Sequence, residues 1–313
     1  MHRFRLLKLC LIVLGFCPAR LLWGAQVSIL LNWYPEPEHA GLYVARDEGL
    51  FRKEGLDVRL MPGGAQVNPL ALLATGKVDV AISDAAQVLL AREEGVPVMA
   101  FFSTYDTFPQ AFIYHLSHPL RDFADLAGRN VIVSPGASYW VYLEKKYRLQ
   151  GKVRRVNPTG QMTPFLRDPK AAIEGFAHSE PFFAKKAGAE VGMLLIADSG
   201  FNPYGNVLCV RENTWKEKPD LVKALYKAVQ AGWARYWENP ARADKSLLAD
   251  NPQLFPEFLH WAAEEQKAFM GKHLDKMGKM EVRRWQELAL QMQEIGQISE
   301  KSHWQGAYLS IEP

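Results

Sequence analysis

The chain has 313 residues, of which 48% are hydrophobic and 23% charged, and this length and composition fit a globular protein of two ordinary domains while excluding a disordered chain. Its formal net charge of +3 includes four positive charges within the first 25 residues, so the remainder carries −1. No strongly positive field is left to attract nucleic acid or an anionic membrane, and we expect no nucleic-acid partner.

The first 25 residues have the pattern of a secretory signal peptide. Three basic residues within the first eight positions precede the apolar run Leu9–Cys17, which is too short to span a bilayer. Cleavage is expected after Gly24 or Ala25 and would place the mature protein in the periplasm. An amphipathic N-terminal helix and lipid attachment at Cys17 are the alternatives, although Phe16 lies where a lipobox needs a small residue.

From Gln26 on, short apolar runs alternate with segments of helical periodicity. The predicted elements, in chain order, are strand Val27–Leu31, helix Glu38–Glu48, strand Leu56–Met61, helix Val67–Thr75, strand Val78–Ile82, helix Ala85–Glu94 and strand Val98–Phe102. This alternation predicts βαβ units and a largely parallel sheet, and the continuous hydrophobicity of the strands predicts burial on both faces.

The alternation restarts after Pro109. The predicted strands are Ala111–His115, Asn130–Ser134, Val153–Val156 and Val191–Ile196, and the predicted helices are Ser138–Leu149, Asp168–Phe176 and Pro181–Ala187. After one more strand, Val207–Val210, the chain is predicted to be helical at Asp220–Trp237, Ala241–Ala249, Pro256–Ala268 and Glu281–Gly296. These last helices have no sheet of their own, so they must cover one of the two sheets.

This organisation predicts an α/β protein with two βα lobes. Residues 26–108 form the first part of lobe 1, residues 109–203 form lobe 2, and residues 204–313 return to lobe 1 and add the C-terminal helices. The chain would cross between the lobes near Pro109 and Pro203, which predicts a hinge of two segments. Ligands of open α/β sheets bind outside the carboxyl ends of the strands, so a binding cleft is expected between the lobes.

Three motifs in chain order carry a resemblance to a known family: LNWYPEPEHAGLYVARDEGLFRKEGLDV at residues 31–58, TGKVDVAI at 75–82 and SEPFF at 179–183. With the signal peptide, they resemble periplasmic substrate-binding proteins of ABC importers, in the branch related to thiamin pyrimidine precursor binding proteins and pyrimidine synthases. The resemblance covers nearly the whole mature chain. It implies a bilobed type II periplasmic-binding-protein fold, hinge closure over a small-molecule ligand, an ABC permease as partner and a monomer.

The synthases of this branch use a lysine that holds pyridoxal phosphate and a histidine four residues later. Aligned on the motif at residues 78–80, these places hold Ser83 and Gln87, which offer neither an amine for a Schiff base nor an imidazole. Cys209 is the only cysteine after the signal peptide, so the cysteine-rich iron motif of those enzymes is missing and no internal disulfide is expected. We therefore expect a binding protein without a cofactor rather than an enzyme.

The turn after the first strand holds the densest group of candidate ligand contacts. Trp33 and Tyr34 offer aromatic faces to a planar ring, and Asn32 offers a donor and an acceptor together. The alternative for each is a structural role at the junction between strand and helix. His39 can bond a ligand or the fold itself, and too few ligating side chains surround it to predict a metal site.

Candidate contacts also follow the other strands. Glycines and small polar residues before helices can hold an anion or a carbonyl oxygen through backbone N–H groups, and this set comprises Gly64, Gln66, Ser83, Asp84, Ser134, Gly136 and Ser138. Tyr139 in the second lobe, together with Tyr105 and Tyr204 beside the crossings, completes the aromatic candidates. Such glycine-rich turns are common, and a tyrosine in a helix can simply pack.

Carboxylates in the cleft would bind the amino group or a ring N–H of a heterocycle. Glu180 is the candidate on lobe 2, with an exposed helix cap as its alternative. Glu36 and Glu38 precede a predicted helix, where the helix dipole favours carboxylates in any protein, and they are not counted among the predicted contacts.

Together these features predict a periplasmic solute-binding protein of an ABC importer that binds a small planar heteroaromatic solute. An organic sulfonate, nitrate or another small anion is the first alternative, and it would favour an Arg or Lys in the cleft, which the expected cleft loops lack. A secreted pyrimidine-processing enzyme is the second alternative. A sensor domain is a third, which a neighbouring receptor kinase gene in place of permease and ATPase genes would indicate.

Overall fold

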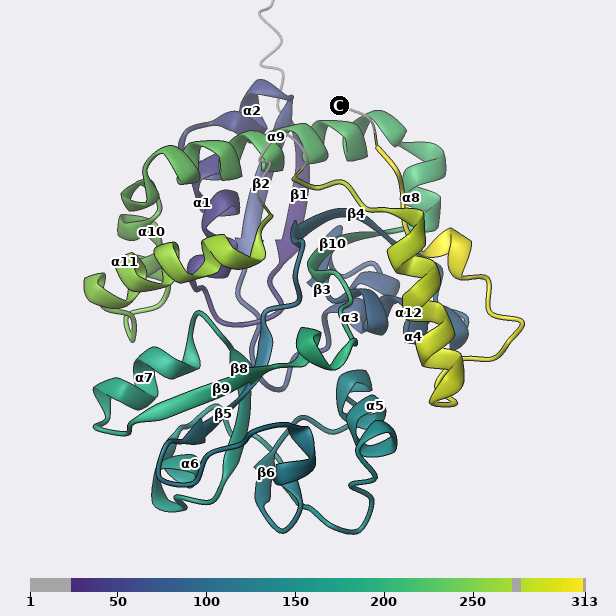
Figure 1. The fold of residues 1–313 in the computed structure, drawn as a ribbon. Coiled ribbons are helices and arrows are strands. Elements are labelled where there is room, and N and C mark those ends of the chain that lie inside the picture. Colours follow the sequence, from purple (N-terminus) through teal and green to yellow (C-terminus); the bar gives the residue numbers. More distant parts are fainter. Residues whose placement is uncertain (1–23, 272–276, 312–313) are drawn as a thin grey trace, which may run out of the picture.

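The computed structural model describes residues 24–271 and 277–311, and the predicted signal peptide lies almost wholly outside these residues. The chain forms two five-stranded sheets, one in each lobe, with helices around them (Figure 1). None of the described helices is both long and apolar enough to cross a membrane.

The first sheet has the strand order β2-β1-β3-β10-β4. Its strands are β1 (Ala25–Leu30), β2 (Leu56–Met61), β3 (Val80–Ser83), β4 (Val98–Tyr105) and β10 (Gly205–Arg211). β1 pairs in parallel with β2 and β3, whereas β10 is antiparallel to both β3 and β4. β4 is buried along its whole length, as expected for a strand covered on both faces.

The second sheet repeats this pattern with the order β7-β6-β8-β5-β9. Its strands are β5 (Gln110–His115), β6 (Asn130–Ile132), β7 (Arg154–Val156), β8 (Ala172–Phe176) and β9 (Val191–Leu195). β5 is the antiparallel insertion here, in the position that β10 occupies in the first sheet. In both sheets the inserted strand is the first one after the chain crosses from the other lobe, and the predicted bilobed α/β fold is confirmed.

The helices surround the sheets as the alternation predicts. Lobe 1 begins with α1 (Ala40–Asp47), α2 (Leu50–Lys53), α3 (Pro69–Ala74) and α4 (Ala85–Glu93), lobe 2 holds α5 (Ser138–Lys146), α6 (Thr163–Arg167) and α7 (Glu180–Lys186), and the C-terminal part holds α8 (Glu212–Glu217), α9 (Pro219–Glu238), α10 (Asp244–Asp250), α11 (Pro256–Glu265) and α12 (Val282–Glu294). The C-terminal helices pack mainly on lobe 1, with α9 against α1 and α12 against α4 (Figure 1).

Two glycines allow the close crossing of α1 and α9. A Cβ atom on Gly41 would lie 2.3 Å from the ring of Trp233, and one on Gly232 would lie 2.2 Å from the carbonyl oxygen of Gly41. Because backbone cannot move aside as a flexible side chain can, larger residues would separate the two helices. This contact anchors the long C-terminal helix directly over the helix that follows the turn at residues 32–39.

The predicted helix Asp168–Phe176 is wrong. The segment instead contains β8, the central strand of the second sheet, which pairs in parallel with β6 and antiparallel with β5. Its alanines and glutamate favour a helix locally, but pairing with a strand on each side outweighs local propensity. The error matters because β8 carries Glu174, a polar residue of the site described below.

Candidate functional site

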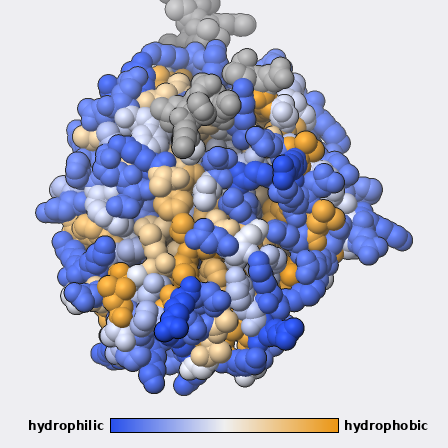
Figure 2. Space-filling model, viewed as in Figure 1, coloured by the Kyte–Doolittle hydropathy of each residue, from blue (hydrophilic) through white to orange (hydrophobic). Residues whose placement is uncertain are grey.

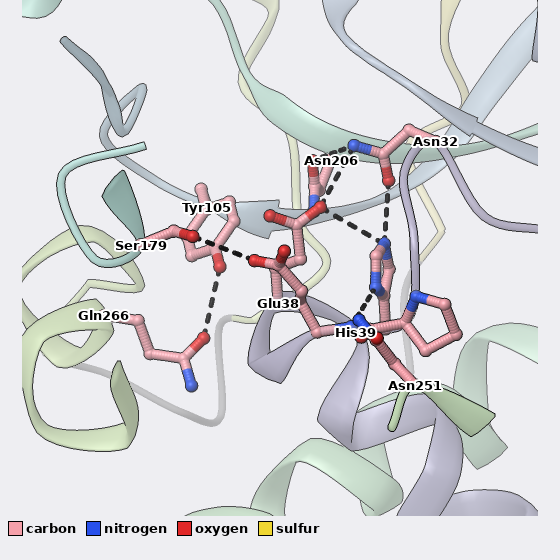
Figure 3. Close-up of polar contacts among 10 residues, drawn as sticks. Asn32, Glu38, His39, Tyr105, Ser179, Asn206, Asn251 and Gln266 are labelled. Carbon is pink, nitrogen blue, oxygen red and sulfur yellow. Dashed lines mark hydrogen bonds and ion pairs between the residues drawn. The ribbon is translucent and has the colours of Figure 1, made fainter. Parts of the chain in front are cut away.

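The turn between β1 and α1 is held rigidly at the junction of the lobes. Glu36 is in an extended conformation, Pro37 starts a short 3-10 helix (Pro37–His39), and the His39 N–H donates to the Glu36 carbonyl at 2.9 Å. Asn251 from the C-terminal region donates to the Pro35 carbonyl at 3.0 Å (Figure 3). The prolines and these bonds leave the turn few alternative conformations.

Asn32, Glu38 and His39 form one hydrogen-bonded group within this turn (Figure 3). The Glu36 N–H donates to Nδ1 of His39 at 3.3 Å, so the ring proton is on Nε2, which donates to Oδ1 of Asn32 at 2.9 Å. Oε1 of Glu38 accepts from the Asn32 amide at 3.2 Å and lies 3.2 Å from Nε2 of His39. Burial raises the pKa of Glu38, but the charge and hydrogen bond of His39, followed by His178 and Asn206, together lower it overall.

Asn206 connects this group to the strand that returns from lobe 2. It lies at the start of β10 with φ of 45°, a left-handed conformation that asparagine tolerates better than most residues. Its Oδ1 accepts a hydrogen bond from the Asn32 amide at 3.3 Å. Sequence reasoning missed Asn206, and the only signal was an asparagine after Gly205 at a predicted crossing.

Lobe 2 contacts the turn through the segment between β8 and α7. The hydroxyl of Ser179 donates to Oε2 of Glu36 at 3.0 Å, which joins the two lobes directly (Figure 3). The ring of His178 lies 5.4 Å from that of Tyr105, at an interplanar angle of 32°. Burial lowers the pKa of His178 to about 4, so the ring is neutral at pH 7, and its Nε2 has no hydrogen-bond partner. These contacts, together with Glu180, whose charge acts on Glu36, define a group that we call the interlobe cluster. Its members are Asn32, Glu36, Glu38, His39, Tyr105, His178, Ser179, Glu180 and Asn206.

Glu180 is the lobe 2 carboxyl of the interlobe cluster. The Phe176 N–H donates to its Oε2 at 2.5 Å, and the carboxyl lies so close to Gly175 that a Cβ atom there would be 2.4 Å from it. Burial raises the pKa of Glu180 to about 7. Burial also raises the pKa of Glu36, and the charges of Glu38 and Glu180 raise it further.

Glu174 organises the lobe 2 loop that precedes α5. Its Oε1 accepts from the Ser134 N–H at 2.9 Å and from the Ser134 hydroxyl, and its Oε2 accepts from the hydroxyl of Tyr139. Burial raises the pKa of Glu174. The charges of Glu174 and Asp84 both act on Tyr139. Tyr139 and its partner Glu174 therefore face the start of α4 in lobe 1, where Asp84 lies. Asp84 caps α4 by accepting from the Gln87 N–H at 3.0 Å, and burial raises its pKa to about 6.

Three of the remaining predicted contacts, Trp33, Tyr34 and Gly64, belong to two neighbouring turns of lobe 1. Trp33 and Tyr34 form an edge-to-face pair with ring centroids 5.4 Å apart, and Tyr34 is 49% exposed. A Cβ atom on Gly64 would lie 3.1 Å from the Tyr34 ring, so these two turns are neighbours. Ser83 is half-buried at the end of β3.

Several predicted contacts do not join the interlobe cluster. Gln66 and Gly136 are exposed, and Ser138 is buried with an unpartnered hydroxyl. Tyr204 faces α12: its hydroxyl accepts from the Glu281 N–H at 2.8 Å, and Arg284 lies 3.8 Å above its ring.

Tyr105 and His39, by contrast, lie in the cluster but are tied to the fold. The Tyr105 hydroxyl donates to Oε1 of Gln266 at 3.1 Å, and Gln266 donates in turn to Tyr236 at 2.9 Å.

The lobes also touch beside the interlobe cluster. Phe182 and Phe183 of α7 pack against Phe258 of α11, with ring centroids 5.3 Å and 4.7 Å apart. Figure 2 shows apolar side chains gathered along the middle of this face of the molecule. With the Ser179–Glu36 bond, this contact holds the two lobes against each other in this structure.

Five carboxyls at this junction, which we call the site carboxyls, lack a lysine or arginine partner among the described residues: Glu36, Glu38, Asp84, Glu174 and Glu180. Their protein donors are backbone N–H groups, hydroxyls, an asparagine amide and a histidine. Among the described residues, no Lys or Arg forms an ion pair with any of them. Over the same residues, no three His, Cys, Asp or Glu side chains are arranged to hold a metal ion.

Comparison with known proteins shows which family the chain resembles. A family model described as NMT1/THI5 like matches residues 36–243. The chain is 30% identical over 243 residues to the riboflavin-binding protein RibY of Chloroflexus aurantiacus, covering 74% of this chain and 67% of RibY. It is 24% identical over 276 residues to the formylaminopyrimidine-binding protein of Halalkalibacterium halodurans, covering 84% and 83%. It is also 24% identical over 243 residues to the 4-amino-5-hydroxymethyl-2-methylpyrimidine phosphate synthase of Legionella pneumophila, covering 74% and 75%.

Solved structures agree on the fold. The periplasmic aliphatic sulphonate binding protein SsuA of Escherichia coli matches with a TM-score of 0.66 at 14% identity, over 92% of each chain. A ligand-binding component of an ABC-type import system from Staphylococcus aureus matches with a TM-score of 0.63 at 13% identity, over 90% of this chain and 99% of that one. At such identities the similarity concerns the periplasmic-binding-protein fold and not the ligand.

Proposed function

Since this chain belongs to the NMT1/THI5-like family, we propose that it is the periplasmic solute-binding protein of an ABC importer. Its ligand is a small planar heteroaromatic solute, with the pyrimidine precursors of thiamin as the first candidates. The ligand binds between the lobes at the interlobe cluster, and the closed protein delivers it to a membrane permease. The predicted signal peptide supports export of the chain to the periplasm.

The observation that carries this proposal is the set of site carboxyls at the junction of the lobes. Carboxylates accept hydrogen bonds from amino groups and ring N–H groups, whereas they repel a sulfonate or nitrate. An anion site would instead need basic side chains or convergent N–H groups. The Ser134 N–H, which could serve an anion, is already bonded to Glu174.

The aromatic residues at the end of β1 supply the second requirement. Trp33 is half-buried beside the exposed Tyr34, on the turn that carries Asn32 and Glu38. An indole face in this position suits stacking on a heteroaromatic ring, whose edge would then point toward the polar groups of the same turn. The printed names of two relatives, a riboflavin-binding and a formylaminopyrimidine-binding protein, both concern heteroaromatic ligands.

Release requires the lobes to separate, and we assign the hinge to residues 106–109 and 196–204. Arg284 of α12 holds both crossings: Nη1 donates to Asp106 at 2.9 Å and Nη2 to the Asn202 carbonyl at 3.0 Å. The Phe108 N–H also donates to the Asn202 side chain at 2.8 Å. The two crossings are thus bonded to each other and to one helix, as expected of a pair of segments that move together.

A thermal-shift screen of the mature protein tests the ligand class. The probes are 4-amino-5-hydroxymethyl-2-methylpyrimidine, riboflavin, taurine and nitrate. A ligand that binds only the folded form adds about 2.7 kcal/mol at 100 times its dissociation constant. We expect one of the heteroaromatic probes to raise the melting temperature. A shift with taurine or nitrate alone would overturn the proposal.

A binding role also predicts that the solute leaves the protein unchanged. Some relatives are named synthases, and incubation of the purified protein with the bound heteroaromatic solute, followed by mass spectrometry, distinguishes the two activities. We expect full recovery of the solute. Stoichiometric or catalytic conversion would show an enzyme.

A further inference from the structure

The site carboxyls bring more negative charge to the interlobe cluster than the protein itself can neutralise. Glu36 and Glu38 come from the turn after β1 and Glu180 from the start of α7. The charges of Glu38 and Glu180 act on Glu36, and the charge of Glu38 also acts on Glu180. Glu174 and Asp84 approach the same junction from β8 and α4. The protein groups that face them are the neutral hydroxyls of Ser179, Tyr105 and Tyr139, amides, and two histidines.

The histidines compensate Glu38 but not Glu36 or Glu180. His39 lies 3.2 Å from Glu38 and lowers the pKa of that carboxyl, and its ring nitrogens bond to Asn32 and to the backbone N–H of Glu36. His178 is 2% exposed and lies among aromatic rings, with its Nε2 unpartnered. An unpartnered buried ring nitrogen within electrostatic reach of Glu38 is a second feature, independent of the carboxyls, that calls for a ligand.

A buried carboxylate without a compensating charge is strongly unfavourable. The closed site must therefore take up protons or enclose a positive charge. A metal ion does not fit, because no three acidic or histidine side chains of the described chain converge on one point. The remaining source of positive charge is the ligand itself.

Resting on the function proposed above, we propose that the ligand is bound as an organic cation: a planar ring carrying a protonated nitrogen, on the ring or on a short side arm, that donates to carboxylates of the interlobe cluster. Glu36 and Glu180, one from each lobe, are the specificity-determining pair. The ring stacks at Trp33. A neutral heterocycle of the same shape must bring protons with it when the lobes close, whereas a cation need not.

A pair of matched probes separates these cases. 4-Amino-5-aminomethyl-2-methylpyrimidine carries an ammonium group at neutral pH, and 4-amino-5-hydroxymethyl-2-methylpyrimidine carries a hydroxyl in the same place. In titration calorimetry at pH 7.5, we expect the ammonium probe to bind at least tenfold more tightly. Raising the pH from 6.5 to 8 should weaken the hydroxyl probe and leave the ammonium probe nearly unchanged.

The variants Glu180→Gln and Glu36→Gln test the residues. Each should reduce the preference for the ammonium probe to about twofold or less while retaining affinity for the hydroxyl probe. Glu48→Gln, outside the site, should keep the full preference. Two substitutions at separate positions guard against misfolding of one, and melting curves verify both.

The outcomes are distinct for the two proposals. Equal affinity for the two probes, with the same pH dependence, would overturn the cationic ligand but leave heteroaromatic binding intact. If neither probe nor riboflavin binds while taurine or nitrate does, the proposed function itself is wrong.

Discussion

Two groups of carboxyls in this protein differ in their partners and in the direction of their pKa shifts. Glu48 ends α1 on the outside of lobe 1, where it accepts hydrogen bonds from Arg235 at 2.8 Å and Arg242 at 2.5 Å. Burial slightly raises its pKa, but the two arginines outweigh this and the pKa is lowered. Glu36 and Glu180 at the junction of the lobes have no arginine, and burial raises the pKa of both.

The difference shows how this fold treats acids of different purpose. Where a carboxylate only joins helices, as Glu48 joins α1 to the C-terminal helices, the chain supplies the cation itself. At the junction of the lobes the chain supplies only neutral donors to Glu36 and Glu180, and no lysine or arginine of the described residues pairs with their negative charge. Under the proposed function, a closed site of this kind is costly when empty, and a complementary cationic ligand would remove that cost.

The largest expected effect is on closure of the ligand-free protein as pH changes. Burial raises the pKa of Glu180 to about 7 in this structure, and we expect the ordinary value of 4.5 once opening of the lobes exposes the carboxyl. Because the pKa is raised, protonated Glu180 stabilises the closed form. This stabilisation is fully present below pH 4.5 and is lost as the pH rises through 7. The difference is on the order of 3 kcal/mol. Asp84, with its pKa raised to about 6, acts in the same direction.

His178 opposes this trend at the acid end. Its pKa is lowered from 6.5 to about 4, so its contribution to the closed form is present above pH 6.5 and lost as pH falls toward 4. Four carboxyls with raised pKa values outweigh this one histidine.

Small-angle scattering should therefore show a smaller radius of gyration at pH 5.5 than at pH 8, with a weaker dependence in Glu180→Gln. A radius that is independent of pH, or larger at pH 5.5, would contradict the prediction.

A smaller effect is expected when the lobe 2 half of the site loses its anchor. Glu174→Ala removes the acceptor for Ser134 and Tyr139, which frees the loop before α5. Hydrogen bonds to a charged group are worth about 1.5 to 3 kcal/mol, so ligand affinity should fall by roughly 10- to 100-fold. Because Glu174 acts through its neighbours, the isosteric Glu174→Gln should restore much of the affinity. Calorimetry on both variants measures the ligand affinity. An equal loss of affinity in the two variants would mean that Glu174 contacts the ligand directly.

Glu174 also shows where sequence reasoning failed. Alanine and glutamate in its segment favour a helix, and a helix gives no reason to place that side chain beside Ser134. Only the pairing of β8 with strands from two other parts of the chain turns Glu174 toward the junction. Long-range pairing of this kind leaves no local signal.

Other features could be predicted because they rest on local patterns. The alternation of apolar strands and helices indicates the two βα lobes, and the proline-rich turn after β1 indicates where Asn32 and His39 lie. The roles of Glu36 and Glu38 were not predictable, since a helix start explains carboxylates there without any partner. What separates Glu36 from an ordinary cap is Ser179, which lies 143 residues away in the other lobe.

The smallest effect is expected at Glu48, which is already paired with two arginines. Glu48→Gln weakens two charge-assisted bonds at a partly exposed position, so we expect the free energy of unfolding to fall by about 0.5 to 1 kcal/mol. Ligand affinity should stay within twofold, because Glu48 and its arginines join helices of lobe 1 only. Urea unfolding and calorimetry on the same preparation check both statements. A loss of affinity comparable to that of Glu180→Gln would mean that carboxyls anywhere on lobe 1 tune binding, and the contrast between paired and unpaired acids would then lose its functional meaning.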